Sequence, residues 1–298
     1  ERVMTQHDIM GNWRNFDDAV AVGGWSMDDH PAKGFYDSDK RPCRQFNKVA
    51  AYNIPFSSLY SKDIKNLIMA GRNISCSHVS FTSTRVMSTC SVIGQAVGTA
   101  AALCVDAGVT PSELRADKSM LRKLQQTLIK DDQTILGLKN EDSADLARSA
   151  SASASESIDA SSPANVLSGV NIDTPKGVEN KWVATASSQP TLSLSWKSPV
   201  KISKAQFTFD GGNVELAQTH SDYLLKNMHR GAQKELVRDF DVSAVLPDGK
   251  EKVLARVRGN FQRLVRCDFE PVQAVGLKTK ILATNGSPKA TVREVRVY

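Results

Sequence analysis

The pattern of hydrophobic positions changes once along this chain of 298 residues. In the first part, an apolar run over residues 64–70 stops at Gly71, a polar loop follows over residues 72–83, and a run of small and apolar residues extends from Arg85 to 108. This order predicts a strand, a turn of close backbone approach and a buried helix. Residues 110–138 predict a Pro-started turn and a second, amphipathic helix.

The long helix is expected to pack closely against another part of the protein. Residues three and four apart share one helix face, and here that face carries small residues: Ser91, Gly94, Gly98 and Ala101. Because glycine costs a helix roughly 1 kcal/mol relative to alanine, two glycines one turn apart need a compensating contact. The expected caps are Ser83 or Thr84 at the N-terminus and Gly108 at the C-terminus.

No membrane-spanning segment is expected. The longest apolar run, residues 92–105, contains Gln95 and several glycines and alanines, and it is shorter than the ~20 residues that cross a bilayer. Such a run is typical of a core helix.

The residues before these elements predict one short helix and one long loop. Asp17 and Asp18 suit a first helical turn, which Gly23 and Gly24 then end. Residues 26–47 form a long irregular run with proline, glycine and many charges. Such a loop is either a functional cover or a solvated surface loop, and the sequence leaves both open.

The second part of the chain has the pattern of an all-β domain. From residue 182 onward, short alternating runs recur between turn signals such as DGGN at Asp210 and PDGK at Pro247. Strands of this length at this spacing predict an antiparallel β-sandwich. Alanines alternate with serines over residues 150–154, which predicts an edge strand rather than a flexible linker.

The boundary between the two parts is expected near residue 140. Residues 140–147 are rich in charge and lack apolar periodicity. We therefore predict a first domain over residues 1–139, a linker over 140–147 and a second domain over 148–298.

Composition narrows the functional classes. The formal charge of +6 and the pI near 9.0 are modest, and Lys and Arg are scattered among Asp and Glu, so nucleic acid is not the expected partner. The five cysteines form no CxxC pair and the five histidines are dispersed, so neither a metal site nor a disulfide framework is predicted.

Two stretches of the first part identify a family. YNIPFSSLYSKDIKNLIMAGRNIS, from Tyr52, and TSTRVMSTCSVIGQAVGTAAAL, from Thr82, resemble the C-terminal portion of bacterial FAD-dependent oxidoreductases. The resemblance covers Phe16 to Leu138 and implies an α/β flavoprotein domain with FAD as cofactor and a small-molecule or carbohydrate substrate. That family holds the ADP half of FAD with an N-terminal GxGxxG loop, and no GxGxxG occurs here.

This difference leads us to expect a piece of a longer protein, and the alternative is a domain that has lost its cofactor. The chain opens Glu-Arg-Val-Met inside the family pattern, without an initiator Met. The expected partner is the missing N-terminal portion of the same polypeptide, and the isolated chain is expected to be inactive and to bind FAD weakly or not at all.

The resemblance also implies cofactor-binding residues. Gly71 would let the backbone approach the cofactor, with Arg72 and Asn73 near the flavin or its ribityl chain. The alternative for these three residues is a tight turn with a surface arginine.

The start of the long helix is the second expected flavin contact. Arg85, Val86 and Met87 offer unpaired N–H groups and the positive end of the helix dipole. Aimed at the flavin N1 and C2 carbonyl, they would stabilise the reduced anionic cofactor.

Two residues of the connecting loop are candidates for chemistry. His78 suits an acid or base beside the flavin, because histidine is the usual side chain for proton transfer at neutral pH, although a lone histidine is as often structural. Cys76 raises the possibility of thiol chemistry or a covalent flavin link, with a buried inert thiol as the default.

The second part resembles the discoidin-like or galactose-binding β-sandwich, a jelly-roll fold found beside carbohydrate-active domains. The residues that carry this are ENKW at Glu179, the stretch from Arg256 to Gly286 and the closing ATVREVRVY. The resemblance implies architecture more than a sugar, and it suggests a periplasmic or secreted protein.

The sequence does not decide whether the sandwich binds calcium or a sugar. Asp210, Asn213 and Asp248 either hold calcium or make hairpin turns, and turns are favoured. Few aromatic residues are present to stack on a sugar. The alternative function for the whole chain is a non-catalytic carbohydrate-binding or polysaccharide-processing accessory protein.

Overall fold

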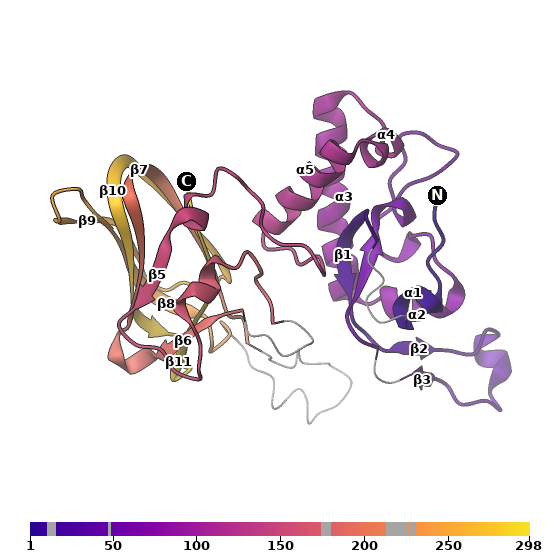
Figure 1. Cartoon of the computed structure of the whole chain (residues 1–298). Coiled ribbons are helices and arrows are strands. Elements are labelled where there is room, and N and C mark those ends of the chain that lie inside the picture. Colours follow the sequence, from indigo (N-terminus) through magenta and orange to yellow (C-terminus); the bar gives the residue numbers. More distant parts are fainter. Residues whose placement is uncertain (11–15, 47–48, 174–179, 213–225, 227–230) are drawn as a thin grey trace. The chain divides into compact units, whose positions relative to one another are not determined.

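The chain of the computed structural model divides into two compact units, residues 1–139 and residues 140–298. The structure describes all residues except 11–15, 47–48, 174–179, 213–225 and 227–230 (Figure 1). The residues predicted to form a linker, 140–147, group with the second unit.

The first unit is mainly helical, with two small antiparallel strand pairs, β1–β4 and β2–β3. Helices α3 and α5 contact each other and β1, and together they enclose the core (Figure 1). The elements are α1 (Gln6–Met10), β1 (Ala19–Gly23), β2 (Met27–Asp29), η1 (Gly34–Asp37), β3 (Arg44–Phe46), β4 (Tyr52–Pro55), η2 (Phe56–Ser58), η3 (Gly71–Asn73), α2 (His78–Thr84), α3 (Met87–Ala107), α4 (Pro111–Ala116) and α5 (Lys118–Lys130).

The predicted helical turn after Asp17 is wrong, because residues 19–23 form strand β1 and pair with β4. Asp18 does not face a helix dipole. It is 1% exposed, accepts the Ser57 N–H at 2.9 Å and pairs with Arg115 Nε at 3.1 Å. These partners are distant in sequence, so the local pattern of two acids before apolar residues could not indicate them.

The predicted strand over residues 64–70 is also wrong. Only an isolated bridge between Tyr60 and Ile68 is present, and Ile64 and Leu67 are 54% and 41% exposed. The Ser61 hydroxyl accepts the N–H groups of Asp63 and Ile64 at 3.2 and 3.0 Å. This side-chain turn takes the backbone donors that a strand would need.

A separate helix, α2, replaces most of the predicted loop before the long helix. Ser77 caps it by accepting the Ser80 N–H, and Ser83 and Thr84 lie inside it rather than capping α3. Helix α3 begins at Met87 and ends as predicted, with Gly108 in the left-handed conformation at φ 66°.

Helix α3 has one buried and one open face, so the expectation of a fully buried helix is corrected. Its buried residues are Thr89, Ile93, Ala96, Ala100 and Cys104, whereas Met87 and Val105 are 88% and 81% exposed. A Cβ added at Gly94 or Gly98 would meet no heavy atom of the described residues within 4 Å. By length and composition alone α3 is long and apolar enough to cross a membrane, a test that core helices of soluble proteins also pass.

The predicted amphipathic helix is confirmed as two elements. Thr110 and Glu113 form a capping box at the start of α4, and Asp117 caps α5. The residues Leu121, Leu124, Leu128 and Ile129 of α5 are buried.

The second unit is the predicted antiparallel β-sandwich. Its elements are η4 (Leu146–Ser149), β5 (Ser151–Ala154), η5 (Pro163–Leu167), β6 (Trp182–Thr185), η6 (Ala186–Ser188), β7 (Thr191–Phe209), β8 (Val237–Val245), β9 (Glu251–Val257), β10 (Leu264–Thr284) and β11 (Lys289–Val297). The order is β6-β11-β7-β10-β8-β9, with the predicted edge strand β5 on the first half of β7. The long strands β7 and β10 run through both layers, and register shifts near residues 268–276 mark their bend (Figure 1).

The core between the layers is aromatic. Phe207, Phe209 and Phe240 have ring centroids 5.2 to 6.1 Å apart. Trp182 is fully buried and donates its indole N–H to Glu156 O at 3.0 Å. This satisfies the polar end of a large apolar side chain.

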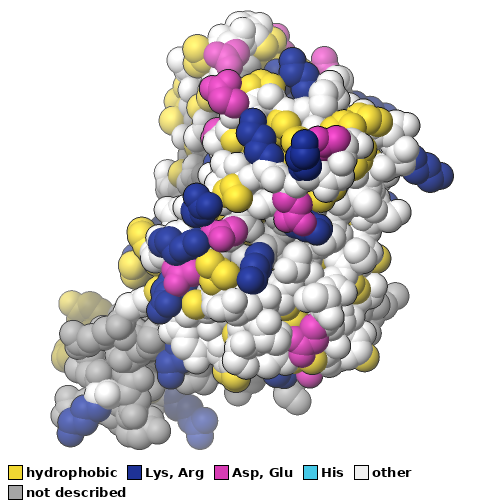
Figure 2. Space-filling model, turned by 90° about the vertical axis from the view of Figure 1, so that its left-hand side faces the viewer, with side chains coloured by type: hydrophobic (Ala, Val, Ile, Leu, Met, Phe, Trp, Pro, Cys, Tyr) yellow, Lys and Arg dark blue, Asp and Glu magenta, His cyan; other side chains and the backbone are white. Residues whose placement is uncertain are grey.

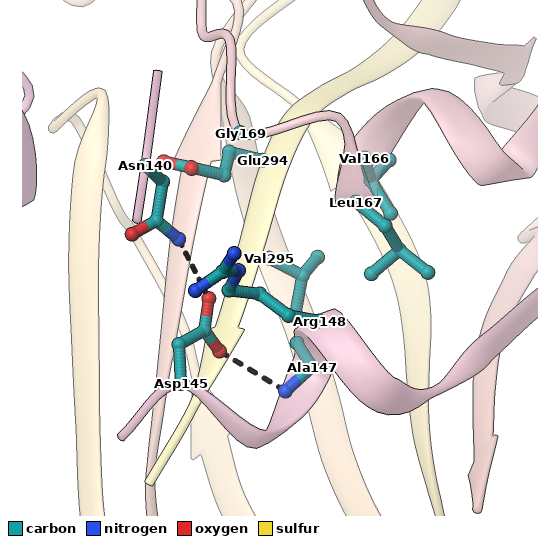
Figure 3. A pocket seen from close by; sticks show the side chains of 9 residues that line it. All are labelled: Asn140, Asp145, Ala147, Arg148, Val166, Leu167, Gly169, Glu294 and Val295. Atoms are coloured by element: carbon teal, nitrogen blue, oxygen red, sulfur yellow. Dashed lines mark hydrogen bonds between the residues drawn. The ribbon is translucent and has the colours of Figure 1, made fainter. Parts of the chain in front are cut away.

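A buried carboxylate fixes the start of the second unit to its last strand. Asp145 Oδ1 accepts the N–H groups of Ala147 at 3.0 Å and Val297 at 2.9 Å, and Asn140 Nδ2 donates to Oδ2 at 2.8 Å (Figure 3). Burial raises the pKa of Asp145, while the hydrogen bonds act to lower it. Residues 140–147 are therefore packed structure rather than a free linker.

Candidate functional site

The predicted catalytic residue His78 is paired with a carboxylate. It is the first residue of α2, and its Nε2 lies 3.1 Å from Asp29 Oδ1 at the end of β2. The imidazole side chain is 62% exposed. A carboxylate on one ring nitrogen orients the imidazole and leaves Nδ1 for a ligand. Asp29 was not predicted, and the Asp28-Asp29-His30 run in a long loop was its only local signal.

The start of α3, where flavin contacts are predicted, has an uncapped backbone. Val86 is the N-cap in an extended conformation, and no side chain caps the helix. The first N–H groups of α3 are therefore not taken by a capping side chain. Arg85 donates from Nη2 to Asp28 O at 3.5 Å, so it lies beside the same strand that holds the His78 partner.

The three predicted residues before α2 form η3, which contacts α3. Gly71 has φ +78°, and a Cβ there would lie 3.9 Å from Cys90 on α3. Arg72 lies over the Phe81 ring of α2, 5.3 Å from its centroid, and Asn73 is exposed. The chain thus brings η3, α2 and the start of α3 together; we call these residues, with Asp28 and Asp29, the junction site.

A hydrogen-bonded chain behind α2 supports the junction site. The Tyr52 hydroxyl and Ser83 Oγ are 2.7 Å apart, and Ser83 donates to Trp25 O at 2.5 Å. Burial raises the pKa of Tyr52, so its hydroxyl stays protonated. The Tyr52 ring packs directly against Gly23, where any larger residue would clash, because a Cβ there would lie 2.5 Å from Tyr52 Cζ.

The cysteines near the junction site are poor nucleophiles. Burial raises the pKa of the Cys76 and Cys90 thiols, and also that of Cys43. A thiol with a raised pKa holds little thiolate at neutral pH. All five cysteines are free.

The donor set of the junction site suits the isoalloxazine end of a flavin. Uncapped backbone N–H groups and the Arg72 and Arg85 guanidiniums are the groups that stabilise electron-rich carbonyls and a developing negative charge. No glycine-rich phosphate loop is present in the sequence, so the residues fit this end of FAD and not its nucleotide end.

A second candidate region is a polar groove of about 530 Å³ on the sandwich. One row of residues in register crosses five strands from β5 to β9: Ser153, Ser193, Lys278, Ser243 and Val253. Thr191, Lys280 and Asp241 form a second row, while the intervening Leu192 and Val242 are buried on the core side. Hydroxyl groups dominate the β5–β7 half of the groove.

Charges in this groove are mixed. Lys278 pairs with Glu251, and Asp241 pairs with Arg258 at 2.7 Å. The surface in Figure 2 likewise shows Lys and Arg interspersed with Asp and Glu. Alternating donors and acceptors suit a neutral polyhydroxylated ligand better than a polyanion.

The predicted calcium candidates make other contacts. Asp210 pairs with Arg293 at 3.3 Å, and Asp248 accepts the Lys250 N–H in the β8–β9 turn. Asn213 lies outside the described residues, and so does Tyr223, one of the few aromatic residues that could stack on a sugar. In the described part of the chain no group of three His, Cys, Asp or Glu residues is placed to hold a metal. Trp182 and Trp196 are buried, so neither offers a platform for a sugar.

Comparison with known proteins identifies the first part of the chain. Residues 1–128 match the family of FAD dependent oxidoreductases, which confirms the resemblance seen in the sequence. No curated protein sequence matches the chain.

Solved structures similar to the chain include carbohydrate-binding modules. The family 32 module of Clostridium perfringens NanJ in complex with galactose has 16% identity and TM-score 0.37, and the match covers 51% of this chain and 94% of that one. A fucose binding module of Streptococcus pneumoniae has 16% identity, TM-score 0.40 and coverages of 53% and 97%. A chitosan-binding module of a Paenibacillus chitosanase/glucanase has 11% identity, TM-score 0.38 and coverages of 52% and 98%.

Proposed function

We propose that this chain is part of an FAD-dependent oxidoreductase and that the junction site forms the isoalloxazine-side wall of its flavin site. The observation that carries the proposal is the convergence of η3, the uncapped start of α3 and the His78–Asp29 pair, within a segment that matches the family. η3, His78 and the start of α3 follow one another closely in the sequence, whereas Asp29 lies 49 positions from His78. Together they collect donors and one acid–base group at one place.

Each residue then has a distinct role. FAD, when bound, supplies the hydride acceptor. Arg85 and the N–H groups after Val86 would hold the electron-rich side of the flavin, and Gly71 would allow close backbone approach beside Arg72. His78, oriented by Asp29 through Nε2, accepts a substrate proton at Nδ1.

The open face of α3 is the proposed contact of a nucleotide-binding portion. Gly94 and Gly98 have no neighbour within 4 Å of a Cβ position among the described residues, yet glycine is costly inside a helix. A second layer of structure on this face would supply the close contact. The proposed partner is the N-terminal portion of the same polypeptide, which would carry the GxGxxG loop.

A visible spectrum tests this proposal. A polypeptide extended upstream through a GxGxxG loop should be yellow and hold FAD, whereas the present chain should bind it weakly or not at all. In the extended protein Arg85→Ala should lower the flavin reduction potential, because it removes a positive charge near the reduced ring. The control Lys118→Ala removes an exposed charge on α5 and should leave the potential unchanged. A colourless extended protein that takes up no added FAD would refute the proposal.

The alternative is a non-catalytic carbohydrate-binding accessory protein, and the groove on the sandwich favours it. Its hydroxyl, Lys and Asp groups alternate across neighbouring strands, as a ligand with many hydroxyls requires. In affinity gels with neutral polysaccharides, Ser193→Tyr should fill the groove and abolish retardation. Ser143→Tyr, at an exposed position outside the groove, is the matched control. Equal mobility of both variants and wild type in every gel would exclude this function. A periplasmic or secreted location accords with either reading.

A further inference from the structure

A pocket of about 320 Å³ opens beside His78, lined by residues 29–44 of the long loop. Strands β2 and β3 form its base, with Asp29 directly opposite Arg44 in the register. His30 Nδ1 lies 2.8 Å from Pro42 O and ties the two sides of the loop together. The loop is therefore organised around a small concavity rather than spread over the surface.

The pocket has an excess of positive charge. Lys33, Lys40, Arg41 and Arg44 line it, against two carboxylates, Asp29 and Asp37. Both carboxylates already have partners of their own. Asp37 pairs with Lys40 at 2.9 Å and accepts the Lys33 N–H at 3.2 Å, and Asp29 pairs with His78.

Three cations are left without a carboxylate partner among the described residues: Lys33, Arg41 and Arg44. Arg44 faces Asp29 across the strands, but the Asp29 carboxylate bonds His78 instead. Like charges gathered in a concave space repel one another and focus a positive potential there. An anionic ligand removes that repulsion, and guanidinium groups match the geometry of carboxylate and phosphate oxygens.

We propose that this pocket binds the oxyanion group of a small acidic substrate, with Arg41, Arg44 and Lys33 holding the anion beside His78. This deepens the proposed function, because it names the substrate class of the junction site. The pocket is at the small end of the range for ligand sites, which suits a ligand the size of one sugar or a comparable acid.

Neighbouring aromatic residues favour an acidic sugar among such ligands. Phe35 and Tyr36, in η1 between Lys33 and Asp37, are each 90% exposed. Large apolar rings held in water are available to cover the C–H face of a sugar. Glucuronate is therefore the first probe, and inorganic phosphate is the second.

Calorimetric titration of the 298-residue chain without FAD tests the proposal directly. Glucuronate or phosphate should bind in the millimolar range at low salt and more weakly at about 200 mM salt, whereas glucose should not bind. Tighter glucuronate binding indicates a carboxylate substrate and tighter phosphate binding a phosphorylated one. Arg41→Gln and Arg44→Gln should each weaken the preferred anion about tenfold, the loss of one charge-assisted contact.

Matched controls separate binding from folding. Lys118→Gln removes one exposed positive charge from the same unit outside the pocket and should change affinity less than about twofold. The His78 ring signals in NMR should shift on anion addition in the wild type and stay fixed in Arg44→Gln, and urea melts should show that the variants fold.

Several results would overturn the proposal. The proposal fails if neither glucuronate nor phosphate binds, or if Arg41→Gln and Arg44→Gln both bind the anion as tightly as the wild type does. It also fails if glucose binds as tightly as glucuronate. Because no FAD is present, failure here leaves the flavin assignment standing, and a colourless extended protein leaves the anion site standing.

Discussion

Removal of the Asp145 carboxylate is predicted to destabilise the sandwich, and the structure sets the size of the effect. Asp145 is 4% exposed, and its Oδ1 accepts the N–H groups of Ala147 and Val297. Asp145→Ala leaves both backbone donors buried without a partner. Each such donor costs about 1–3 kcal/mol, so the free energy of unfolding should fall by about 2–6 kcal/mol.

Asp145→Asn separates the hydrogen bonds from the charge. The amide oxygen still accepts both backbone N–H groups, and only the Asn140 donor at 2.8 Å is lost. The expected loss is about 1 kcal/mol at neutral pH. Because burial raises the pKa of Asp145 in the folded state, its contribution to wild-type stability is full below pH about 4 and declines as pH rises through the folded pKa. The difference between wild type and Asp145→Asn should therefore be smaller at pH 7 than at pH 4.

Urea denaturation followed by tryptophan fluorescence measures these differences, because Trp182 and Trp196 are buried in the same unit. Asp159→Asn is the control: it removes an exposed charge that pairs with Lys289 at 2.7 Å and should cost less than about 1 kcal/mol, and asparagine tolerates the φ of 56° at this position. If Asp145→Ala unfolds at the same urea concentration as Asp159→Asn, the reasoning about buried donors fails.

Other substitutions and one chemical probe test further parts of the structure. Gly98→Ala should stabilise this chain by up to about 1 kcal/mol and so raise its thermal midpoint, because the added methyl meets no atom of the described residues within 4 Å; an unchanged or lower midpoint would contradict an open α3 face. Gly23→Ala should lower stability by about 1–3 kcal/mol in urea melts, because its Cβ would lie 2.5 Å from Tyr52 Cζ, and wild-type stability would show that the ring moves freely. Iodoacetamide should label Cys104 and Cys267 slowly at pH 7.5 and faster as pH rises, because burial raises the pKa of both thiols, to about 11 for Cys267. Rapid labelling of the native protein, followed by mass spectrometry, would refute this.

The features that the sequence predicts well depend on local physics. Alternation of serine and alanine specified β5, and Gly108 marked the C-terminal end of α3. A glycine that takes the left-handed conformation at a helix end, or a period of two that separates the faces of a strand, is visible within a few residues.

The errors arose where distant contacts decide the conformation. Residues 19–23 form a strand because β4, about 30 positions later, supplies its partner. Residues 64–70 remained irregular because Ser61 captures their first donors and no neighbouring strand offers a ladder. An apolar run is compatible with a strand, but the sequence does not state whether a partner is available.

The candidate site has the same dependence on distant contacts. The resemblance to a family placed His78, Arg72 and Arg85 near a cofactor, but the Asp29 partner lies 49 positions away. Its pairing follows from the packing of α2 on β2, which no periodicity expresses. The cationic pocket likewise combines four basic residues from a loop that the sequence left open between cover and surface.

Two parts of helix α3, its start and its open face, lack contacts of different kinds. At the start, no side chain caps the first backbone N–H groups, and an electron-rich group can accept their hydrogen bonds. The open face exposes Met87 and Val105, and no atom of the described residues lies within 4 Å of a Cβ position at Gly94 or Gly98. Packed structure is needed to cover these apolar side chains and to fill the space beside the glycines. A single small ligand cannot meet both requirements. Since Gly98→Ala should stabilise this chain and yet fill the space that a packed partner needs, its effects on stability and on FAD retention in the extended protein should have opposite signs.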